Sequence, residues 1–390
     1  MLPPEDELCL LLARTHLSSE ARERALSLLA GPLEWPRLFE RARTYEIFPL
    51  VFAGLRTLGF PNERDSVRLE WTKVFKSNAI RNELLARESA RIMRLLGDAG
   101  IPVMPLKGIA LAESLYGDAA LRACADIDVL VPPRNAIEAF HVVVSSGYRP
   151  EFTEPRLLGL LARYARDFMM MTRQDSAGTY TCELHCALIW GSSLERELLD
   201  EIWSSATYKT FFGCHTRSLS PEWELVYLAV HAARHGGPSL KWLADVDRLC
   251  CGGAIDWKKA SEKAKWVGWE AVVRSSLAVC ASLFETPVDP AFASTAVAHR
   301  PVTPRAVEVP GASEILFSLR LLKTPGRRLR YLAAHLFMPT QADCRLLPLP
   351  SSLFLVYYAL RPFRVACNTA WWFAQAGLRA LQRTLRNLWD

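Results

Sequence analysis

Apolar residues recur at helical spacing over most of the first hundred positions of the chain. Leu8, Leu11 and Leu12 begin this pattern, and a long later segment keeps its apolar residues on one face with a period of 3.6 residues until Gly97. The pattern predicts helices over residues 21–30, 36–43, 49–58 and 66–97. Residues 1–98 contain no grouping of catalytic side chains, so we predict a helical domain whose role is packing.

The pattern becomes that of short strands after residue 100. Residues 101–106 form an apolar run that predicts a strand, and a Lys-Gly pair then turns the chain into a helix. A second apolar run, 126–131, contains two acids and is stopped by two prolines. Residues 179–188 alternate between polar and apolar side chains, as a half-buried strand does. The helices expected between these strands cover residues 109–116, 136–146 and 154–171, the last of which includes three consecutive methionines.

Helical spacing returns from residue 194 and continues towards the C-terminus. Ser220-Pro221-Glu222 is a strong helix start, and further helices are predicted over 240–249 and from residue 255 onwards. The four predicted regions are a helical domain over 1–98, a core over 99–192, a helical domain completing the site over 193–300, and a basic helical region over 301–390 that begins with a proline-containing linker, 301–310.

The chain is mildly basic, and its basic excess is local. The net charge is +6, while residues 321–390 hold ten Lys and Arg against two Asp, so the rest of the chain is slightly acidic. A mild excess of this size does not require a nucleic-acid partner, and we do not expect one.

The final segment combines aromatic and basic residues. Residues 371–373 (Trp-Trp-Phe) are followed by Arg379, Arg383 and Arg386 at positions i, i+4 and i+7. Such a helix could make a weak contact with an anionic membrane surface. It could equally cap the fold and present its bases to solvent, and this second interpretation is favoured.

Cysteine usage and terminal composition indicate the compartment. The ten cysteines include no Cys-x-x-Cys pair, which disfavours a zinc ribbon, and free thiols fit a reducing cytosol. The first residues carry acids where a secretory signal would carry bases, and no run of about 18 apolar residues occurs. We therefore predict a cytoplasmic protein.

Two carboxylates stand one residue apart in the strand predicted over 126–131. Residues i and i+2 of a strand point to the same face, so Asp126 and Asp128 would project side by side. Like charges held that close repel each other unless a cation lies between them, and a divalent metal is one explanation. A solvated strand end is the alternative. Glu183 and His185 share one face of the later strand and offer a third carboxylate, although polar residues facing solvent would also explain them.

Two other groupings have a weaker chemical signal. Lys107-Gly108 lies before a predicted helix, where free backbone N–H groups and a positive charge suit an anion. His231 and His235 are at i, i+4 on one helix face, a spacing that could bind zinc. The metalloprotease pattern requires Glu directly after the first His, and Ala232 stands there, so hydrogen bonding to neighbouring elements is favoured.

Together these segments resemble the polymerase-β-like nucleotidyltransferase superfamily and, more closely, the bacterial family of uncharacterised nucleotidyltransferases, family 5. The matching residues are 45–50, 106–108, Tyr116, Arg122, 126–131, 183–185, His231, His235, 242–245 and 255–257. Two positions depart from the superfamily. Gly108 is followed by Ile109 rather than Ser or Gly, so a hydroxyl contact to phosphate is missing, and the third acid is Glu183 where Asp is common.

The resemblance implies an α+β fold, in which a small mixed β-sheet nucleotidyltransferase core is embedded in mostly α-helical N- and C-terminal regions. It implies that Asp126, Asp128 and Glu183 hold two Mg²⁺ ions and act in catalysis, with a nucleoside triphosphate, ATP foremost, as substrate. Lys107, Gly108 and Arg122 would bind the nucleotide, although Arg122 could instead brace the aspartates. The residues expected to line or support the acceptor pocket are His185, His231, His235 and Asp245.

The implied reaction moves a nucleoside monophosphate to an acceptor and releases pyrophosphate. The acceptor could be a small molecule, a sugar, a peptide or a protein side chain. The Gly108-Ile109 departure also leaves a second interpretation. In it, the chain is a catalytically weak or inactive binding protein of this fold in a biosynthetic or surface-polysaccharide system.

Overall fold

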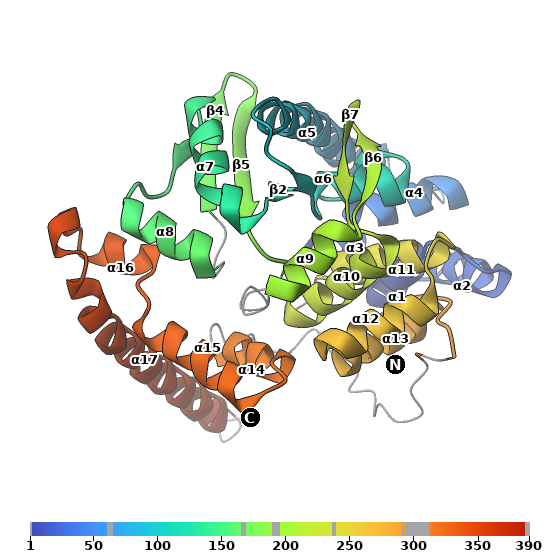
Figure 1. Ribbon diagram of the computed structural model, residues 1–390. Coiled ribbons are helices and arrows are strands. Elements are labelled where there is room, and N and C mark those ends of the chain that lie inside the picture. Colours follow the sequence, from blue (N-terminus) through green and yellow to red (C-terminus); the bar gives the residue numbers. More distant parts are fainter. Residues whose placement is uncertain are drawn as a thin grey trace.

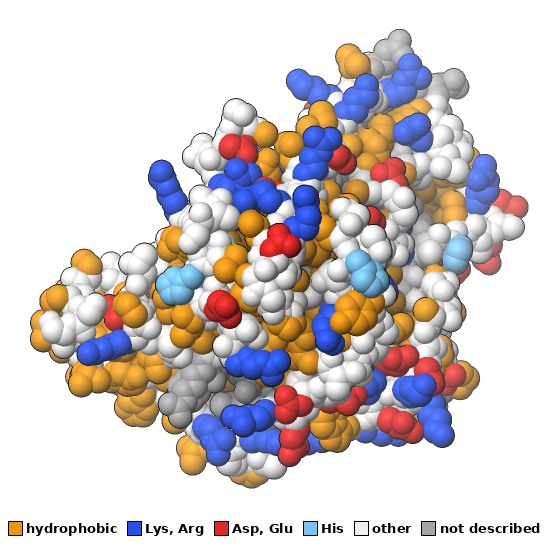
Figure 2. All heavy atoms as spheres, turned by 45° about the horizontal axis from the view of Figure 1, so that its top comes forward, with side chains coloured by type: hydrophobic (Ala, Val, Ile, Leu, Met, Phe, Trp, Pro, Cys, Tyr) orange, Lys and Arg blue, Asp and Glu red, His pale blue; other side chains and the backbone are white. Residues whose placement is uncertain are grey.

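A computed structural model describes residues 2–60, 65–164, 169–188, 196–235, 239–290, 292 and 312–386 of the chain. It confirms the mixed α+β class: a small five-stranded sheet lies among helices that make up most of the molecule (Figure 1). The linker predicted over 301–310 lies outside the described residues. On the face shown in Figure 2, basic and acidic side chains are interspersed, as the mild net charge suggests.

The N-terminal region is helical, as its periodicity predicts. Ser18 caps one of its helices by accepting a hydrogen bond from the Ala21 backbone N–H. The helices are α1 (Pro4–Ala13), α2 (Ser19–Ala30), α3 (Trp35–Thr44), α4 (Phe48–Leu58) and α5 (Asp65–Asp98). Their apolar faces enclose an aromatic cluster around Trp71, which is 1% exposed. The same core includes Ala244 and Phe284 from later helices, so the N-terminal helices do not pack alone.

The sheet has the strand order β1-β2-β5-β4-β3, and its central pair is parallel. The strands are β1 (Met104–Pro105), β2 (Ile127–Leu130), β3 (Arg149–Pro150), β4 (Met169–Asp175) and β5 (Gly178–His185). Helices α6 (Ile109–Tyr116), α7 (Ala136–Ser145) and α8 (Pro155–Tyr164) connect them. Only Met104 and Pro105 of the strand predicted over 101–106 are in the sheet. Pro102 cannot donate a ladder hydrogen bond, which disfavours pairing at the start of the predicted strand.

Two secondary-structure predictions are wrong. Of the helix predicted over 154–171, α8 covers Pro155–Tyr164, residues 165–168 lie outside the described part, and the three methionines begin β4 instead of continuing a helix. Met169 and Met171 are buried, and Met170 is half-buried. Three consecutive apolar residues fit both the helical period of 3.6 residues and the strand period of 2. Hydrogen-bonded pairing with β5 makes this segment a strand.

The region predicted to be helical from residue 194 contains a β-hairpin. Its strands are β6 (Thr207–Phe211) and β7 (Cys214–Ser218), and Phe212 and Gly213 form the turn, both with positive φ. The alternation in Thr-Tyr-Lys-Thr-Phe and the glycine after it were the signal for this hairpin.

The helices on either side of the hairpin pack into a second core. They are α9 (Arg196–Ser204), α10 (Pro221–His235), α11 (Lys241–Cys251), α12 (Trp257–Val267) and α13 (Glu270–Phe284). Asp256 caps α12 through its side chain, which accepts from the Lys259 backbone N–H. Leu106 and Leu130 at the edge of the sheet join this core, which fixes the helices against the strands.

The C-terminal helices form an arm at the lower left of Figure 1. They are α14 (Ala312–Leu321), α15 (Pro325–Phe337), α16 (Gln341–Leu346) and α17 (Val356–Arg386). Phe354 and Tyr357 pack into the sheet core, and the Ser351 hydroxyl donates to Glu154 at 2.6 Å. The arm is therefore anchored to the sheet.

Two aromatic side chains of α17 are exposed: Phe363 to 72% and Trp371 to 68%. The side chains of Arg379, Arg383 and Arg386 lie outside the described part, so their contact with a membrane stays a prediction. None of the helices, within the described residues, combines the length and the apolar character that crossing a membrane requires. The domain boundaries at 98, 192 and 300 and the cytoplasmic location also stay predictions.

Candidate functional site

The parallel pairing of β2 and β5 brings the predicted acids together. Asp128 lies opposite Glu183 in the register, and Leu130 lies opposite His185. Because alternate strand residues share a face, Asp128, Glu183 and His185 project from the same side of the sheet. The Asp-x-Asp and Glu-x-His segments therefore meet although more than fifty residues separate them.

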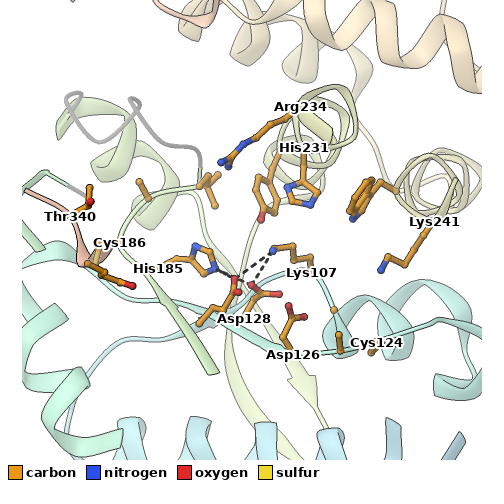
Figure 3. Close-up of a pocket in the computed structure, with 18 of the residues that line it drawn as sticks. Lys107, Cys124, Asp126, Asp128, His185, Cys186, His231, Arg234, Lys241 and Thr340 are labelled. Atoms are coloured by element: carbon orange, nitrogen blue, oxygen red, sulfur yellow. Dashed lines mark hydrogen bonds and ion pairs between the residues drawn. The ribbon is translucent and has the colours of Figure 1, made fainter. Parts of the chain in front are cut away.

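The contacts within this group are short. His185 Nε2 is 2.9 Å from Asp128 Oδ1 and 3.4 Å from Glu183 Oε2. One potential ligand atom of each residue lies within 4.8 Å of the other two, the only such cluster found among the described residues. Figure 3 shows the side chains of His185 and Lys107 directed towards Asp128. Two carboxylates and an imidazole at these distances could hold a metal ion.

Lys107 supplies a positive charge to the same group. Its Nζ is 3.0 Å from Asp128 Oδ1 and 3.9 Å from Glu183 Oε2. Burial tends to raise the pKa of Asp128, but hydrogen bonding to His185 and the Lys107 charge outweigh it and hold the pKa below its usual value. Burial raises the pKa of Glu183. Burial also raises the pKa of Asp126, and the nearby Asp128 charge adds to this effect.

Gly108 lies against the two aspartates. Its φ of 66° and ψ of −130° are accessible to few residues other than glycine. A Cβ at this position would lie 3.3 Å from the Asp126 carbonyl oxygen and 3.5 Å from Asp128 Oδ2. Asp128 Oδ2 is buried and has no hydrogen-bond partner. The glycine therefore leaves space beside a carboxylate oxygen that can still accept a ligand.

Arg122 is fixed in a buried network behind this site. Its Nε and Nη2 each donate to one Asp245 oxygen at 2.8 Å, and its Nη1 donates to the Gly108 carbonyl at 3.1 Å. Tyr116 donates its hydroxyl to Asp245 Oδ1 at 2.6 Å. Arg122 is 3% and Asp245 0% exposed. The geometry fits the bracing role for Arg122, while nucleotide binding by this residue stays a prediction.

Helix α5 holds the backbone that leads into β2. Asn78 and Asn82 both donate to the Arg122 carbonyl, at 3.2 and 2.7 Å. Arg81 donates to the carbonyls of Ala125 and Thr179, at 3.2 and 2.8 Å. One turn and a half of helix therefore ties the segment before Asp126 to the start of β5.

The acids lie in a cleft of about 710 Å³. Its other lining residues on α10 and α11 include Tyr227, His231, Arg234, Lys241 and Trp242. The rings of Tyr227 and His231 are 5.7 Å apart, and those of His231 and Trp242 are 5.5 Å apart, edge to face. A cleft of this volume lies within the usual range for small-molecule sites.

The structure places most of the predicted site residues in this cleft. Lys107, Gly108, Arg122, Asp126, Asp128, Glu183, His185 and His231 line it. Asp245 does not line the cleft but holds Arg122 and Tyr116. His235 is the last residue of α10, and its side chain lies outside the described part.

Several lining residues were missed by the sequence analysis. Tyr227 and Arg234 stand four residues before and three residues after His231, so helical spacing alone could have placed them on its face. The departure at Ile109 has a structural reason: its side chain is 2% exposed and packs in the sheet core rather than in the cleft.

Comparisons with known proteins identify a structure and a family to which the chain is similar. A solved structure of an antigenic nucleotidyltransferase-like protein from Paracoccidioides brasiliensis covers 52% of this chain and 96% of its own, at 15% identity and a TM-score of 0.32. No curated protein matches the chain. Residues 31–285, more than half of the chain and all of the acids described above, match a family described as uncharacterised nucleotidyltransferases. The protein belongs to this nucleotidyltransferase family.

Proposed function

We propose that the protein transfers a nucleoside monophosphate from a nucleoside triphosphate, ATP foremost, to an acceptor hydroxyl with the help of divalent metal ions. The observation that carries this proposal is the group formed by Asp128, Glu183 and His185 beside Gly108. It supplies metal ligands and an uncrowded backbone at one point of a cleft large enough for a nucleotide.

The donor set fits a divalent cation. Asp128 Oδ2 is buried without a partner, and such an oxygen is costly unless something binds it. Asp128 and Glu183 offer the oxygen ligands that Mg²⁺ prefers, and His185 adds a nitrogen. Asp126 lies outside this three-residue group but lines the same cleft and could supply a further oxygen. Two bound Mg²⁺ ions would neutralise the triphosphate and polarise its α-phosphate.

The protein's own residues would position the substrates. Lys107 and the backbone at Gly108 would hold the β- and γ-phosphates, because both lie beside the acids. An acceptor oxygen attacks the α-phosphorus and its proton passes to Glu183. The bond between the α-phosphorus and its bridging oxygen breaks, and pyrophosphate leaves with the bonding electrons. Tyr227 and Trp242 offer aromatic surface for the base.

Nucleotide binding measured by calorimetry tests the proposal. Wild-type protein should bind α,β-methylene-ATP in the presence of Mg²⁺ and bind it at least about tenfold more weakly without the metal. Asp128→Asn should abolish this metal dependence, because the residue loses its charge without losing its shape. Asp98→Asn, at an exposed position at the end of α5, is the matched control. Equal metal dependence in Asp128→Asn and wild type would refute the proposal.

One observation favours a second candidate, a nucleotidyltransferase-fold protein that binds without turnover. Lys107 Nζ already lies 3.0 Å from Asp128 Oδ1, so part of the negative charge is balanced within the protein. The two candidates differ in pyrophosphate release. A transferase should release pyrophosphate from ATP when supplied with cell extract as a source of acceptor, and Glu183→Gln should not. Tight nucleotide binding with no release in either protein would favour the binding role.

A further inference from the structure

Part of the cleft is built by residues beyond the family match. The match ends at residue 285, whereas Thr340, Gln341, Arg345, Arg361 and Arg364 line the same cavity as the acids. We call these five residues the C-terminal wall. They come from α16, the residue before it, and α17. The family's own segment therefore does not complete this cleft.

The family segment contributes charges of both signs to the cleft lining, including the cations Lys107, Arg122, Arg234 and Lys241. The carboxylates of the lining, as far as the structure describes it, are Glu46, Asp126, Asp128 and Glu183, all from the family segment. The C-terminal wall contributes three arginines and, among its described residues, no carboxylate to the lining. Figure 3 shows Thr340 and Lys241 at opposite sides of the site, with Asp128 between them. The acids thus stand between two ends of one cleft, and one of these ends is arginine-rich.

The C-terminal wall is held rigidly. Arg361 and Arg364 both bind Asp343, whose side chain is 2% exposed, and both donate to the Thr340 hydroxyl at 3.1 Å. Thr340 and Asp343 in turn form a capping box at the start of α16. Side chains fixed in advance lose little conformational entropy when a ligand binds. Guanidinium groups match the geometry of phosphate and carboxylate oxygens.

Arg345 extends the C-terminal wall towards solvent. Its side chain is 58% exposed, and its Nη2 forms an ion pair with Glu151, which joins α16 to the sheet domain. An exposed pair of this kind contributes little to folding and exchanges readily for another anion. Arg345 therefore offers a position where charge can be removed while the fold is kept.

We propose that the C-terminal wall binds an anionic group of the acceptor, a phosphate or a carboxylate, on the side of the acids opposite to Lys241. This inference rests on the proposed transferase function. In-line transfer places the attacking acceptor oxygen and the leaving pyrophosphate on opposite sides of the reacting phosphorus. Lys107 and Gly108 lie with the acids and suit the triphosphate, so the arginine-rich end is the side left for the acceptor.

The test measures binding of inorganic phosphate and of acetate by calorimetry, with the full-length protein saturated with Mg²⁺ and α,β-methylene-ATP. The wild type should bind at least one of the two anions. Arg364→Gln and Arg345→Gln should each weaken that binding by about 10- to 100-fold, the scale of one charge-assisted hydrogen bond. Arg330→Gln, at an exposed basic position on α15 that does not line the cleft, should leave it unchanged. Should Arg364→Gln fail to fold, Arg345→Gln decides the question.

The outcomes separate this inference from the function on which it rests. Weaker anion binding with analogue affinity within about twofold of wild type supports the acceptor site. Weaker binding of the analogue itself would show that the C-terminal wall holds the triphosphate, and would overturn the inference while leaving the transferase proposal intact. Anion binding that is absent from the wild type, or equal in all variants, also overturns it. Failure of the proposed transferase function would be seen in the separate nucleotide-binding experiment, as metal dependence in Asp128→Asn equal to that of wild type.

Discussion

Removing the Asp245 carboxylate should destabilise the protein more than most single substitutions do. The residue is fully buried and binds the Arg122 guanidinium through two hydrogen bonds of 2.8 Å. In Asp245→Ala, the Arg122 charge would remain 3% exposed without its partner. Such a charge cannot escape by deprotonation, because arginine stays protonated in proteins.

The magnitude follows from two contributions. Breaking a buried ion pair by removing one partner costs about 3–5 kcal/mol. The Tyr116 hydroxyl also loses its acceptor, which adds about 1 kcal/mol. Since the two contacts share one carboxylate, they will not add fully, and a loss of about 4 kcal/mol is expected for Asp245→Ala. Tyr116→Phe, which removes only the hydroxyl, should cost about 1 kcal/mol.

Urea unfolding followed by circular dichroism measures these changes, and a double variant shows their cause. Arg122→Leu/Asp245→Ala should be less destabilised than Asp245→Ala, because no buried charge is left behind, and Arg122→Leu alone completes the cycle. The coupling energy from the double-mutant cycle should reach about 2 kcal/mol. A cost below about 1 kcal/mol for Asp245→Ala, or a double variant that merely adds the two single effects, would refute the reasoning.

Three further substitutions probe other parts of the fold. Gly108→Ala should cost more than Gly117→Ala in urea unfolding, since both glycines have φ near 67° (66° and 68°) but a Cβ has neighbours within 4 Å only at Gly108; equal costs would contradict this. Trp71→Ala should cost about 3–5 kcal/mol by thermal or urea unfolding, since this 1% exposed ring packs in the aromatic core; a small loss would show that the site collapses. Burial raises the pKa of Glu88, but hydrogen bonds from Arg91, Tyr148 and Arg173 hold it below its usual value. The destabilisation caused by Glu88→Gln should therefore be complete above about pH 4.5 and should shrink as the pH falls through the lower folded-state pKa. A difference in unfolding free energy between wild type and Glu88→Gln that grows on acidification would contradict this.

The helical and strand content of the family segment follows from local pattern. The N-terminal periodicity, the Asp-x-Asp strand and the alternation before His185 each appear where the sequence predicts them. The two errors have a common cause. The run Met169–Met171 and the hairpin strands after residue 206 are short. Whether such short segments form a helix or a strand depends on the segment with which they pair. The sequence shows no partner until the fold is known.

The site was predictable where chemistry and spacing coincide, and not where it depends on distant chain segments. Asp128, Glu183 and His185 follow from strand alternation once the two strands are placed side by side. The buried pair formed by Arg122 and Asp245 depends on a contact across 123 positions, which neither residue's local sequence indicates. The C-terminal wall depends on an arm whose basic composition indicated a surface role, whereas Arg361 and Arg364 bind the largely buried Asp343.

The prediction that the N-terminal helices serve only packing is too narrow, because α5 also fixes the geometry of the acids. Asn82 is 0% exposed and donates to the Arg122 carbonyl, while Arg81 joins the Ala125 carbonyl to that of Thr179. These bonds hold the segment before β2 and the start of β5 against one helix, so the register that pairs Asp128 with Glu183 has support at both strands. A polar side chain on a helix that contributes no residue to the cleft therefore supports the strands that carry the proposed metal ligands. Asn82→Leu should weaken Mg²⁺-dependent nucleotide binding even though position 82 does not line the cleft, and Asn82→Asp, which keeps one oxygen but loses the donor, should not restore it. Unchanged binding in a folded Asn82→Leu protein would show that the strand pairing positions the acids without help from α5.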